Sequence, residues 1–481
     1  MIHCLLAFFS AILLSGCVVG PDYQSPVVPV PKQWYEATTT SKLAQPDKWW
    51  QTFNDKELNQ LIKEAIVANL DLKQALARVK DARAQRWATI AAGLPSVQAK
   101  STASRRFNNS SGAGQSGGAT SGGGFGIGNQ HINIFQLGFD AQWELDFFGG
   151  VRRAVEAADA TVDSEVENSR DVLVTLLGDV ARNYIELRVN QQLVEITRKN
   201  LSAQQETQAL TEVRQQSGLA SMLEVAQAQA QADTTAAQLP NYEALSKQSI
   251  HALSVLLGRE PGALAERLER LATIPVVTTA VIPDLPSELL KRRPDIRHTE
   301  RQLAYANASV GVATAELYPK VNLAAFLGLQ NMTITDFTPV GKSWSAASTL
   351  TMPIFNWGKL NANILSKKAQ FEQAFLSYQA TVLGAFQEVE DALIAYSKEQ
   401  ERHKALAQAV AANQLAVALA NERYEKGLTG FIDVLQTQQA LYQAESNLSA
   451  SDGKLSTNLV ALYKALGGGW QAEARVGNAS K

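Results

Sequence analysis

Residues 136–147 read QLGFDAQWELDF, with apolar and polar side chains alternating along the whole stretch. The apolar positions are Leu137, Phe139, Ala141, Trp143, Leu145 and Phe147. The polar positions include three carboxylates, Asp140, Glu144 and Asp146. A period of two predicts a β-strand with one apolar and one acidic face, long enough to cross a bilayer when tilted. The alternative is a soluble hairpin whose apolar face rests on a core.

The same alternation occurs a second time, between residues 320 and 355. Its apolar positions are Val321, Leu323, Ala325, Leu327, Leu329, Trp344, Ala346, Leu350, Met352 and Ile354. We therefore expect two β-hairpins, at about 96–147 and about 320–355, which give four strands per chain. Because a membrane sheet cannot leave its edges open, other copies of the chain must close it into a barrel. Three copies would give a twelve-stranded barrel that leaves room for solutes, whereas an eight-stranded barrel is filled by its own side chains.

Two landmarks reveal an internal repeat. Leu94-Pro95 recurs as Tyr318-Pro319 after 224 positions, and Gly218-Leu219 recurs as Gly427-Leu428 after 209 positions. The two halves span roughly 57–270 and 286–468. An insert in the first half explains the shorter second spacing, since Ser110–Gly128 contains 13 Gly or Ser in 19 residues.

Each half contains a very long segment without proline. Gly178 is the only glycine from Val151 to Ser217, and Gly384 is the only one from Lys359 to Lys426. We expect helices on the order of 100 Å at 1.5 Å per residue. A return helix follows in each half, and in the second half its apolar residues recur every seven positions, which predicts coiled-coil packing. Those residues are Val434, Leu441, Leu448, Leu455 and Leu462.

The N-terminus carries an apolar run, Leu5–Leu14, that is too short to span a bilayer and is followed by Ser-Gly-Cys17. We expect residues 1–16 to be a signal peptide and Cys17 to carry N-acyl and diacylglycerol lipid, as in the bacterial lipoprotein box. The alternative is an ordinary signal peptide with a chance cysteine. Residues 17–50 are rich in proline and predict an extended strap, with Trp34, Tyr35, Trp49 and Trp50 as apolar footholds.

Composition excludes several classes of protein. The 44 basic and 46 acidic residues are nearly balanced, so no nucleic-acid partner is expected. Cys4 and Cys17 are the only cysteines, and the histidines are scattered, so we expect neither an enzyme nor a metal or other cofactor site. Arg292-Arg293-Pro294-Asp295 is interpreted as a helix start, because Pro and Asp are favoured in a first helical turn.

Motifs along the whole chain resemble the TolC-type outer-membrane factors, in particular their lipoprotein branch (NodT or OprM-like). They are the residues after Cys17 (VVGPDYQSP), 143–149 (WELDFFG), 289–296 (LLKRRPDI), 353–355 (PIF) and 462–470 (LYKALGGGW). The resemblance implies a mixed fold, a membrane β-barrel joined to an α-helical coiled-coil tunnel. It further implies a homotrimer in which the barrel has twelve strands, four from each chain, and the periplasmic tunnel twelve helices.

The function implied is the outer-membrane channel of a tripartite efflux pump. Such a channel lies in the outer-membrane lipid, is anchored there by its own lipid, extends far into the periplasm, and works with a periplasmic adaptor and an inner-membrane transporter of the resistance-nodulation-division class. The alternatives are the duct of a type I protein secretion system and a non-gated passive porin. The strand carboxylates Asp140, Glu144 and Asp146 are expected to face the lumen. The last segment, 469–481, is expected to be a tail.

The resemblance also implies a periplasmic gate at the turns that join long and return helices. Ile432 and Asp433 match the constriction, Tyr424 a linking aromatic, and Glu224 an acidic partner. Gln436 stands where relatives often carry a second acid, and Thr429 where some carry an arginine. We therefore expect both the ring of charges at the constriction and the polar links between neighbouring helices to be weaker here. The alternative is that the two acids only complement helix dipoles.

Overall fold

The computed structural model describes residues 18–36, 46–108, 130–277, 286–334 and 342–471. Cys17 and the insert Ser110–Gly128 lie outside these ranges. The described chain forms two compact units, and each half of the sequence contributes to both. The first unit contains residues 1–25, 81–162 and 302–375, and the second contains 26–80, 163–301 and 376–481.

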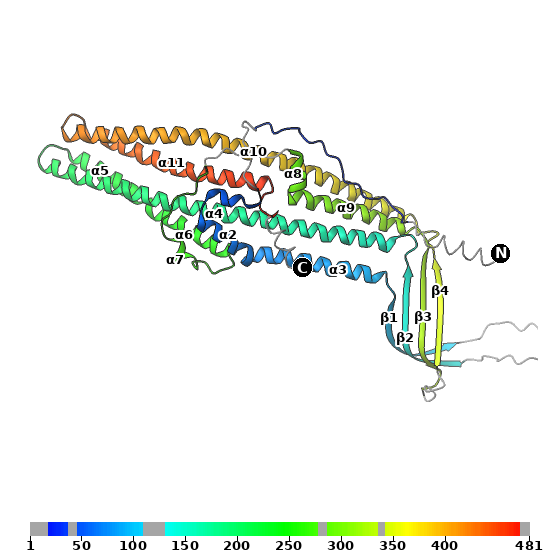
Figure 1. Ribbon diagram of the computed structural model, residues 1–481. Helices are drawn as coiled ribbons and strands as arrows, with labels where there is room; N and C mark the ends of the chain where they lie inside the picture. The colour runs from blue at the N-terminus through cyan, green and yellow to red at the C-terminus, as the bar shows by residue number, and fades with distance from the viewer. Residues whose placement is uncertain (1–17, 37–45, 109–129, 278–285, 335–341, 472–481) are drawn as a thin grey trace, which may run out of the picture. The chain divides into compact units, whose positions relative to one another are not determined.

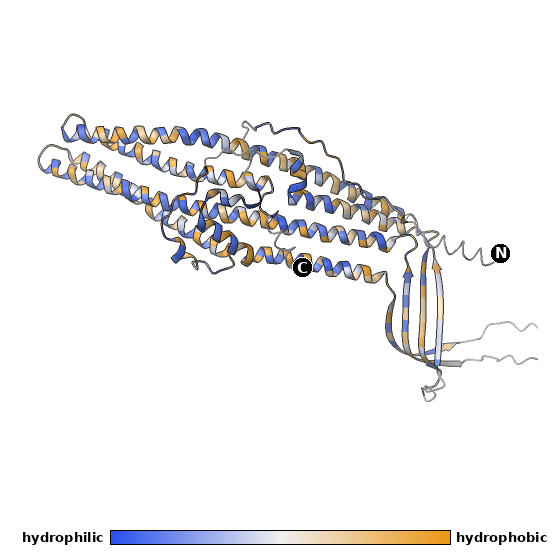
Figure 2. Cartoon of the chain, in the orientation of Figure 1, coloured by the Kyte–Doolittle hydropathy of each residue, from blue (hydrophilic) through white to orange (hydrophobic). Residues whose placement is uncertain are grey.

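The first unit contains one antiparallel sheet with the strand order β1-β2-β3-β4 (Figure 1). The strands are β1 (Ser96–Asn108), β2 (Gln130–Leu145), β3 (Lys320–Asn331) and β4 (Lys342–Thr351). Four strands per chain are thus confirmed. Apolar and polar bands alternate along β2 and β3 (Figure 2), and Phe139 on the apolar face of β2 is 59% exposed. The described part of the chain does not cover this residue.

The two long helices are confirmed. They are α4 (Gly150–Gln216) and α10 (Lys359–Glu425), and each has 67 residues. Two residues past the end of each helix lies a glycine with positive φ, Gly218 (φ 74°) or Gly427 (φ 71°), a conformation that costs glycine least. The N–H of the next residue then donates to a carbonyl in the last turn: Leu219 to Arg214 at 2.8 Å, and Leu428 to Arg423 at 2.8 Å.

The return helices differ between the halves. In the second half α11 (Phe431–Ala465) is continuous, and Val434, Leu455 and Leu462 of its heptad stripe are buried. In the first half the expected single helix is two helices, α5 (Met222–Ala236) and α6 (Leu239–Leu256), with Pro240 in the first turn of α6. The single-helix expectation was wrong there because proline, which lacks an N–H, cannot continue the hydrogen-bonding of a preceding helix.

Shorter helices complete the chain. They are the 3-10 helix η1 (Pro46–Phe53), α2 (Lys56–Ala68), α3 (Leu70–Ala92), α7 (Ala265–Leu268), α8 (Pro286–Arg292) and α9 (Pro294–Ala315). The helix start expected at Pro294 is confirmed. Arg293 adds a tie across the second unit, since it donates to both Asp295 oxygens (3.0 and 2.6 Å) and to the carbonyl of Ala465 (2.9 Å).

The second unit has a large apolar core in which α4 and α11 pack closely. Gly453 of α11 lies so near Val189 of α4 that a methyl group on the glycine would overlap the valine side chain. Trp49 stacks on Tyr463 with ring centroids 5.5 Å apart, and Trp34 packs edge-on against Phe386 at 6.0 Å. Three of the four expected footholds, Trp34, Trp49 and Trp50, are therefore buried.

The expectation that Tyr35 is a fourth foothold was wrong, because this residue is 90% exposed. At this position the backbone makes the contact instead. The N–H groups of Tyr35 and Glu36 donate to the two carboxylate oxygens of Glu390, at 2.8 and 3.0 Å.

Candidate functional site

The end of the second unit where α4 turns into α5, and α10 into α11, holds the gate candidates. Its apolar core is small and consists of Ala228, Ala420, Tyr424, Phe431 and Val434. Beside this core, the contact between α4 and α11 is polar. Asn200 donates to Glu445 and Gln438 donates to Thr207, both at 2.9 Å. Gln204, between Asn200 and Thr207 on α4, is buried, and among the described residues neither of its amide atoms has a hydrogen-bond partner. Among the described residues, the core at this end is thus small and the helix contact beside it is polar.

Glu224 lies in the first turn of α5 and forms a capping box there. Its N–H donates to the Ser221 hydroxyl (3.3 Å), and its carboxylate accepts from the Ser221 N–H (3.4 Å). This geometry fits the helix-start interpretation of Glu224.

Tyr424, at the end of α10, is buried to 4% exposure and packs against Phe431 with ring centroids 5.8 Å apart. The Arg214 guanidinium of α4 lies over the Tyr424 ring, 4.5 Å from its centroid, and donates to the Tyr424 carbonyl at 3.0 Å. Within the described part of the chain, the Tyr424 hydroxyl has no hydrogen-bond partner. Arg214, from the α4–α5 hairpin, thus contacts both the ring and the backbone of Tyr424.

Sequence reasoning missed Arg214. The available signal was its position four residues before Gly218, which matches Arg423 before Gly427, and the preference of cations for the last turn of a helix. The stacking partner, more than 200 residues away, could only be found in the folded chain.

The remaining gate candidates lie at the start of α11. Ile432 is 46% exposed, and Asp433 and Gln436 are exposed. The Thr429 hydroxyl donates to the Asp433 carboxylate. Thr429 therefore binds the acid from within the same turn.

The three strand carboxylates each have a cation nearby. Asp140 lies 3.4 Å from Lys100, Glu144 lies 3.7 Å from Lys320, and Asp146, just past the end of β2, lies 3.3 Å from Arg152. Asp146 also accepts the backbone N–H of Arg152, at the start of α4, at 2.9 Å. Paired in this way, these carboxylates give the polar face of the sheet little net negative charge.

The residues directly after Cys17 are fastened to the first unit. Arg153 of α4 donates to the carbonyls of Val19 (3.1 Å) and Gly20 (3.2 Å) and to the Asp22 carboxylate (2.8 Å). The Val19 N–H donates to the Phe148 carbonyl at 3.2 Å. Arg153 is only 3% exposed, so these contacts satisfy a buried charge.

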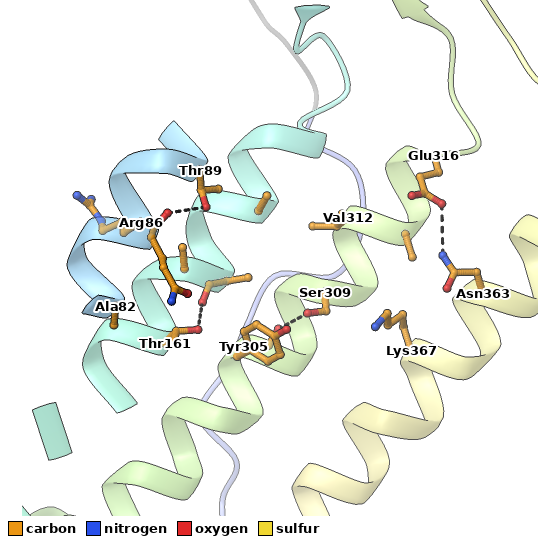
Figure 3. A pocket seen from close by; sticks show the side chains of 15 residues that line it. Ala82, Arg86, Thr89, Thr161, Tyr305, Ser309, Val312, Glu316, Asn363 and Lys367 are labelled. Atoms are coloured by element: carbon orange, nitrogen blue, oxygen red, sulfur yellow. Dashed lines mark hydrogen bonds between the residues drawn. The ribbon is translucent and has the colours of Figure 1, made fainter. Parts of the chain in front are cut away.

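A cavity of about 410 Å³ in the first unit is lined by α3, α4, α9 and α10 (Figure 3). Its hydroxyls are engaged within their own helices: Thr89 donates to Gln85, Thr161 to Ala157, and Ser309 to Tyr305, at 2.9–3.0 Å (Figure 3). Glu316 accepts from Asn363 at 3.3 Å. These three hydroxyls therefore donate to backbone carbonyls and not to a side-chain base that could activate them.

The described residues contain no group of three or more His, Cys, Asp or Glu side chains placed to hold a metal ion. Among the described helices, none combines the length and the apolar character needed to cross a membrane.

The fold and these sites define a class of protein. A family model, "Outer membrane efflux protein", matches residues 61–259 and 285–468, so the chain belongs to the outer membrane efflux protein family. The family resemblance expected from the motifs is confirmed. The role of this family is transport.

Two relatives align with nearly the whole chain. Nodulation protein T of Rhizobium leguminosarum bv. viciae is 33% identical over 467 residues, 96% of this chain and 92% of the relative. The probable efflux pump outer membrane protein TtgC of Pseudomonas putida is 34% identical over 483 residues, 98% and 96% of the two chains.

Solved structures share the fold. The outer-membrane channel OprN is 33% identical with a TM-score of 0.86, over 95% of this chain and all (100%) of that one. The open state of the MtrE outer membrane channel of Neisseria gonorrhoeae is 27% identical with a TM-score of 0.81, over 95% and 99% of the chains. This chain is therefore an outer-membrane channel of an efflux pump, as expected from the sequence, and its fold combines the strands of a β-barrel with a helical tunnel.

Replacing Arg214 with leucine should loosen the tip of the second unit. The stack on Tyr424 contributes about 0.5–2 kcal/mol, so amide hydrogen exchange near residues 420–428 should rise several-fold, roughly tenfold per 1.4 kcal/mol. The matched control is Arg198→Leu, also on α4, which loses only an exposed ion pair with Glu243. Equal exchange in both variants would show that the stack on Tyr424 does not stabilise residues 420–428.

Proposed function

We propose that three copies of this chain assemble into one duct, with a twelve-stranded barrel in the outer membrane and a twelve-helix tunnel in the periplasm. The observation that carries this proposal is a four-stranded sheet with two open edges, on a chain whose apolar strand face is exposed. Three sheets of four strands give twelve, a barrel wide enough to pass solutes. Helices on the order of 100 Å have the length to cross the periplasm.

The two sequence repeats, 57–270 and 286–468, would each supply a hairpin, a long helix and a return path to this assembly. Residues 469–481 would follow as a tail. At the inner end of the tunnel, the duct would meet a periplasmic adaptor and an inner-membrane transporter of the resistance-nodulation-division class. TtgC, which is named as a probable outer membrane protein of an efflux pump, supports placing the duct in a pump.

A charge on the lipid face of β2 should block insertion. Phe139→Arg is expected to cost roughly 2–4 kcal/mol near the middle of the bilayer, whereas Gln142→Arg on the opposite face should insert normally. The mass of the detergent-solubilised protein, measured by light scattering, should be that of a trimer for the parent and for Gln142→Arg. A folded, water-soluble monomer of the parent chain would overturn the proposed assembly.

We also propose that Cys17 carries the N-acyl and diacylglycerol lipid and that residues 17–50 form the strap behind it, after removal of the signal peptide 1–16. Support comes from the contacts of Arg153 with residues 19–22, which would keep the anchored end against the first unit. The acyl chains would then enter the lipid beside the barrel.

Labelled palmitate should enter the parent chain and be absent from Cys17→Ser. Barrel closure contributes more to stable insertion than acyl chains do, so the variant should still reach the membrane in part if a signal cut occurs elsewhere. Cys4→Ser, which changes the only other cysteine, should label like the parent. Equal labelling of Cys17→Ser and the parent chain would show that Cys17 does not carry the lipid.

Finally, we propose that Ile432 and Asp433 line a periplasmic constriction, with Tyr424 packed behind them and Glu224 at the adjoining helix start. Both constriction side chains are exposed at the first turn of α11, so three copies around an axis could bring three carboxylates together. Gln436, one turn further, adds no charge. The barrel carboxylates Asp140, Glu144 and Asp146 would face the lumen in pairs with lysine or arginine.

Hexammine cobalt added on the periplasmic side should block the channel through Asp433. In planar bilayers, Asp433→Asn keeps an acceptor for Thr429 but removes the charge, so block should weaken roughly tenfold, equivalent to about 1.4 kcal/mol. Ile432→Ala should raise the resting conductance because it removes apolar bulk. Unchanged block and conductance in an assembled trimer would leave both residues as ordinary helix-start positions.

A further inference from the structure

The internal repeat extends to the hydrogen-bond register of the sheet. A shift of 224 positions carries β1 onto β3, and a shift of 209 carries β2 onto β4, as the sequence landmarks require. Under these shifts the pair Ser96–Gln142 becomes Lys320–Thr351, which is the register observed between β3 and β4. The pair Gln98–Asp140 likewise becomes the observed pair Asn322–Thr349. The two hairpins therefore have the same register.

The chain also contains the junction between a first and a second hairpin. It is the β2–β3 pairing, in which Ala141 lies opposite Ala325 and Asp140 opposite Phe326. The reverse junction, from a second hairpin to a first, has no counterpart inside one chain, because β1 and β4 are the two edges of the sheet. In a closed barrel, a second copy of this chain must supply it.

We infer that β4 of one copy pairs antiparallel with β1 of the next, with Leu350 opposite the partner subunit's Ser101 and Thr349 opposite the partner subunit's Thr102. The same two shifts, applied to the β2–β3 pairs, give this register. The inference rests on the proposed trimer and adds the residue-level geometry of its seam. The first strand of a second copy of the chain fits this edge under the same two shifts.

The same shifts keep the two faces of the sheet separate in this register. Directly opposite residues share a face of the sheet, and a slip of one residue exchanges the faces. Leu137 and Phe139 on β2 lie opposite Ser101 and Ala99, so odd-numbered residues of β1 share the apolar face. Leu350 shares that face through Val321, its partner on β3. The pairing of Leu350 with the partner subunit's Ser101 keeps both on one side, which leaves only slips of two or more as alternatives.

The side chains brought together fit a membrane seam. Continued three residues past the end of β4, the register would place Ile354, which is 94% exposed in the single chain, opposite the partner subunit's Val97. At the far end, Trp344 would lie opposite the partner subunit's Phe107. On the other face, Thr349 and Thr351 would meet the partner subunit's Thr102 and the partner subunit's Lys100. On the lipid side, two of the named pairs are thus apolar and Leu350 meets the partner subunit's Ser101, and on the lumen side the named pairs are polar.

Paired cysteines test the register in the full-length protein. Residues directly opposite have Cα atoms about 4.5–5.5 Å apart, within the span of a disulfide, whereas a shift of two residues gives roughly 8 Å, beyond that span. Thr349→Cys with Thr102→Cys should therefore form covalent dimers and trimers under mild oxidation. The matched controls, Thr349→Cys with Ser104→Cys and with Lys100→Cys, place the second cysteine two residues away on the same face and should stay uncrosslinked.

Light scattering of the same samples separates the two levels of the proposal. A trimer that crosslinks only through Thr102→Cys supports the register. A trimer that crosslinks through Ser104→Cys or Lys100→Cys, or through none of the three, overturns the register and leaves the trimeric duct standing. A monomer overturns both. The replaced residues are small and uncharged except for Lys100, and the parent chain measures any background from its two native cysteines.

Discussion

The hydrocarbon core of a membrane offers no hydrogen-bond partner to a peptide group, and the rest of this structure depends on that constraint. A single chain has four strands and leaves β1 and β4 as open edges, so it is incomplete in a membrane. In the proposed assembly, further copies close these edges and so create the pore. Assembly and transport would then both follow from the same unsatisfied backbone.

The two repeats are more alike in their strands than in their helices. The hairpins kept their register across both halves, because a change of one residue would turn apolar side chains toward the lumen. The helical parts were freer to diverge: α11 is continuous, whereas α5 and α6 are separate around Pro240. The tips diverged further. One return helix starts with a Ser221–Glu224 capping box, and the other with Thr429 bound to Asp433.

Features with a local cause could be predicted from the sequence. The alternation around Phe139 predicted a strand, and the absence of proline in α4 and α10 predicted their length, because both signals act over neighbouring residues. Features that depend on distant partners could not. Arg214 stacks on Tyr424 across two hairpins, and Arg153 binds carbonyls of the N-terminal segment, which carry no side-chain signal at all. Tyr35 looked like a foothold because aromatic residues usually are, yet there the backbone binds Glu390.

The close approach of Gly453 to Val189 has an evolutionary consequence. The two helices touch at a point where one partner contributes no side chain, so a larger residue at 453 requires a smaller one at 189. Neither substitution is neutral alone, since the first overlaps its neighbour and the second leaves a hole. Across the family, these two positions should change together, with their summed volume nearly constant. Descent would then preserve the spacing of the helices rather than either residue.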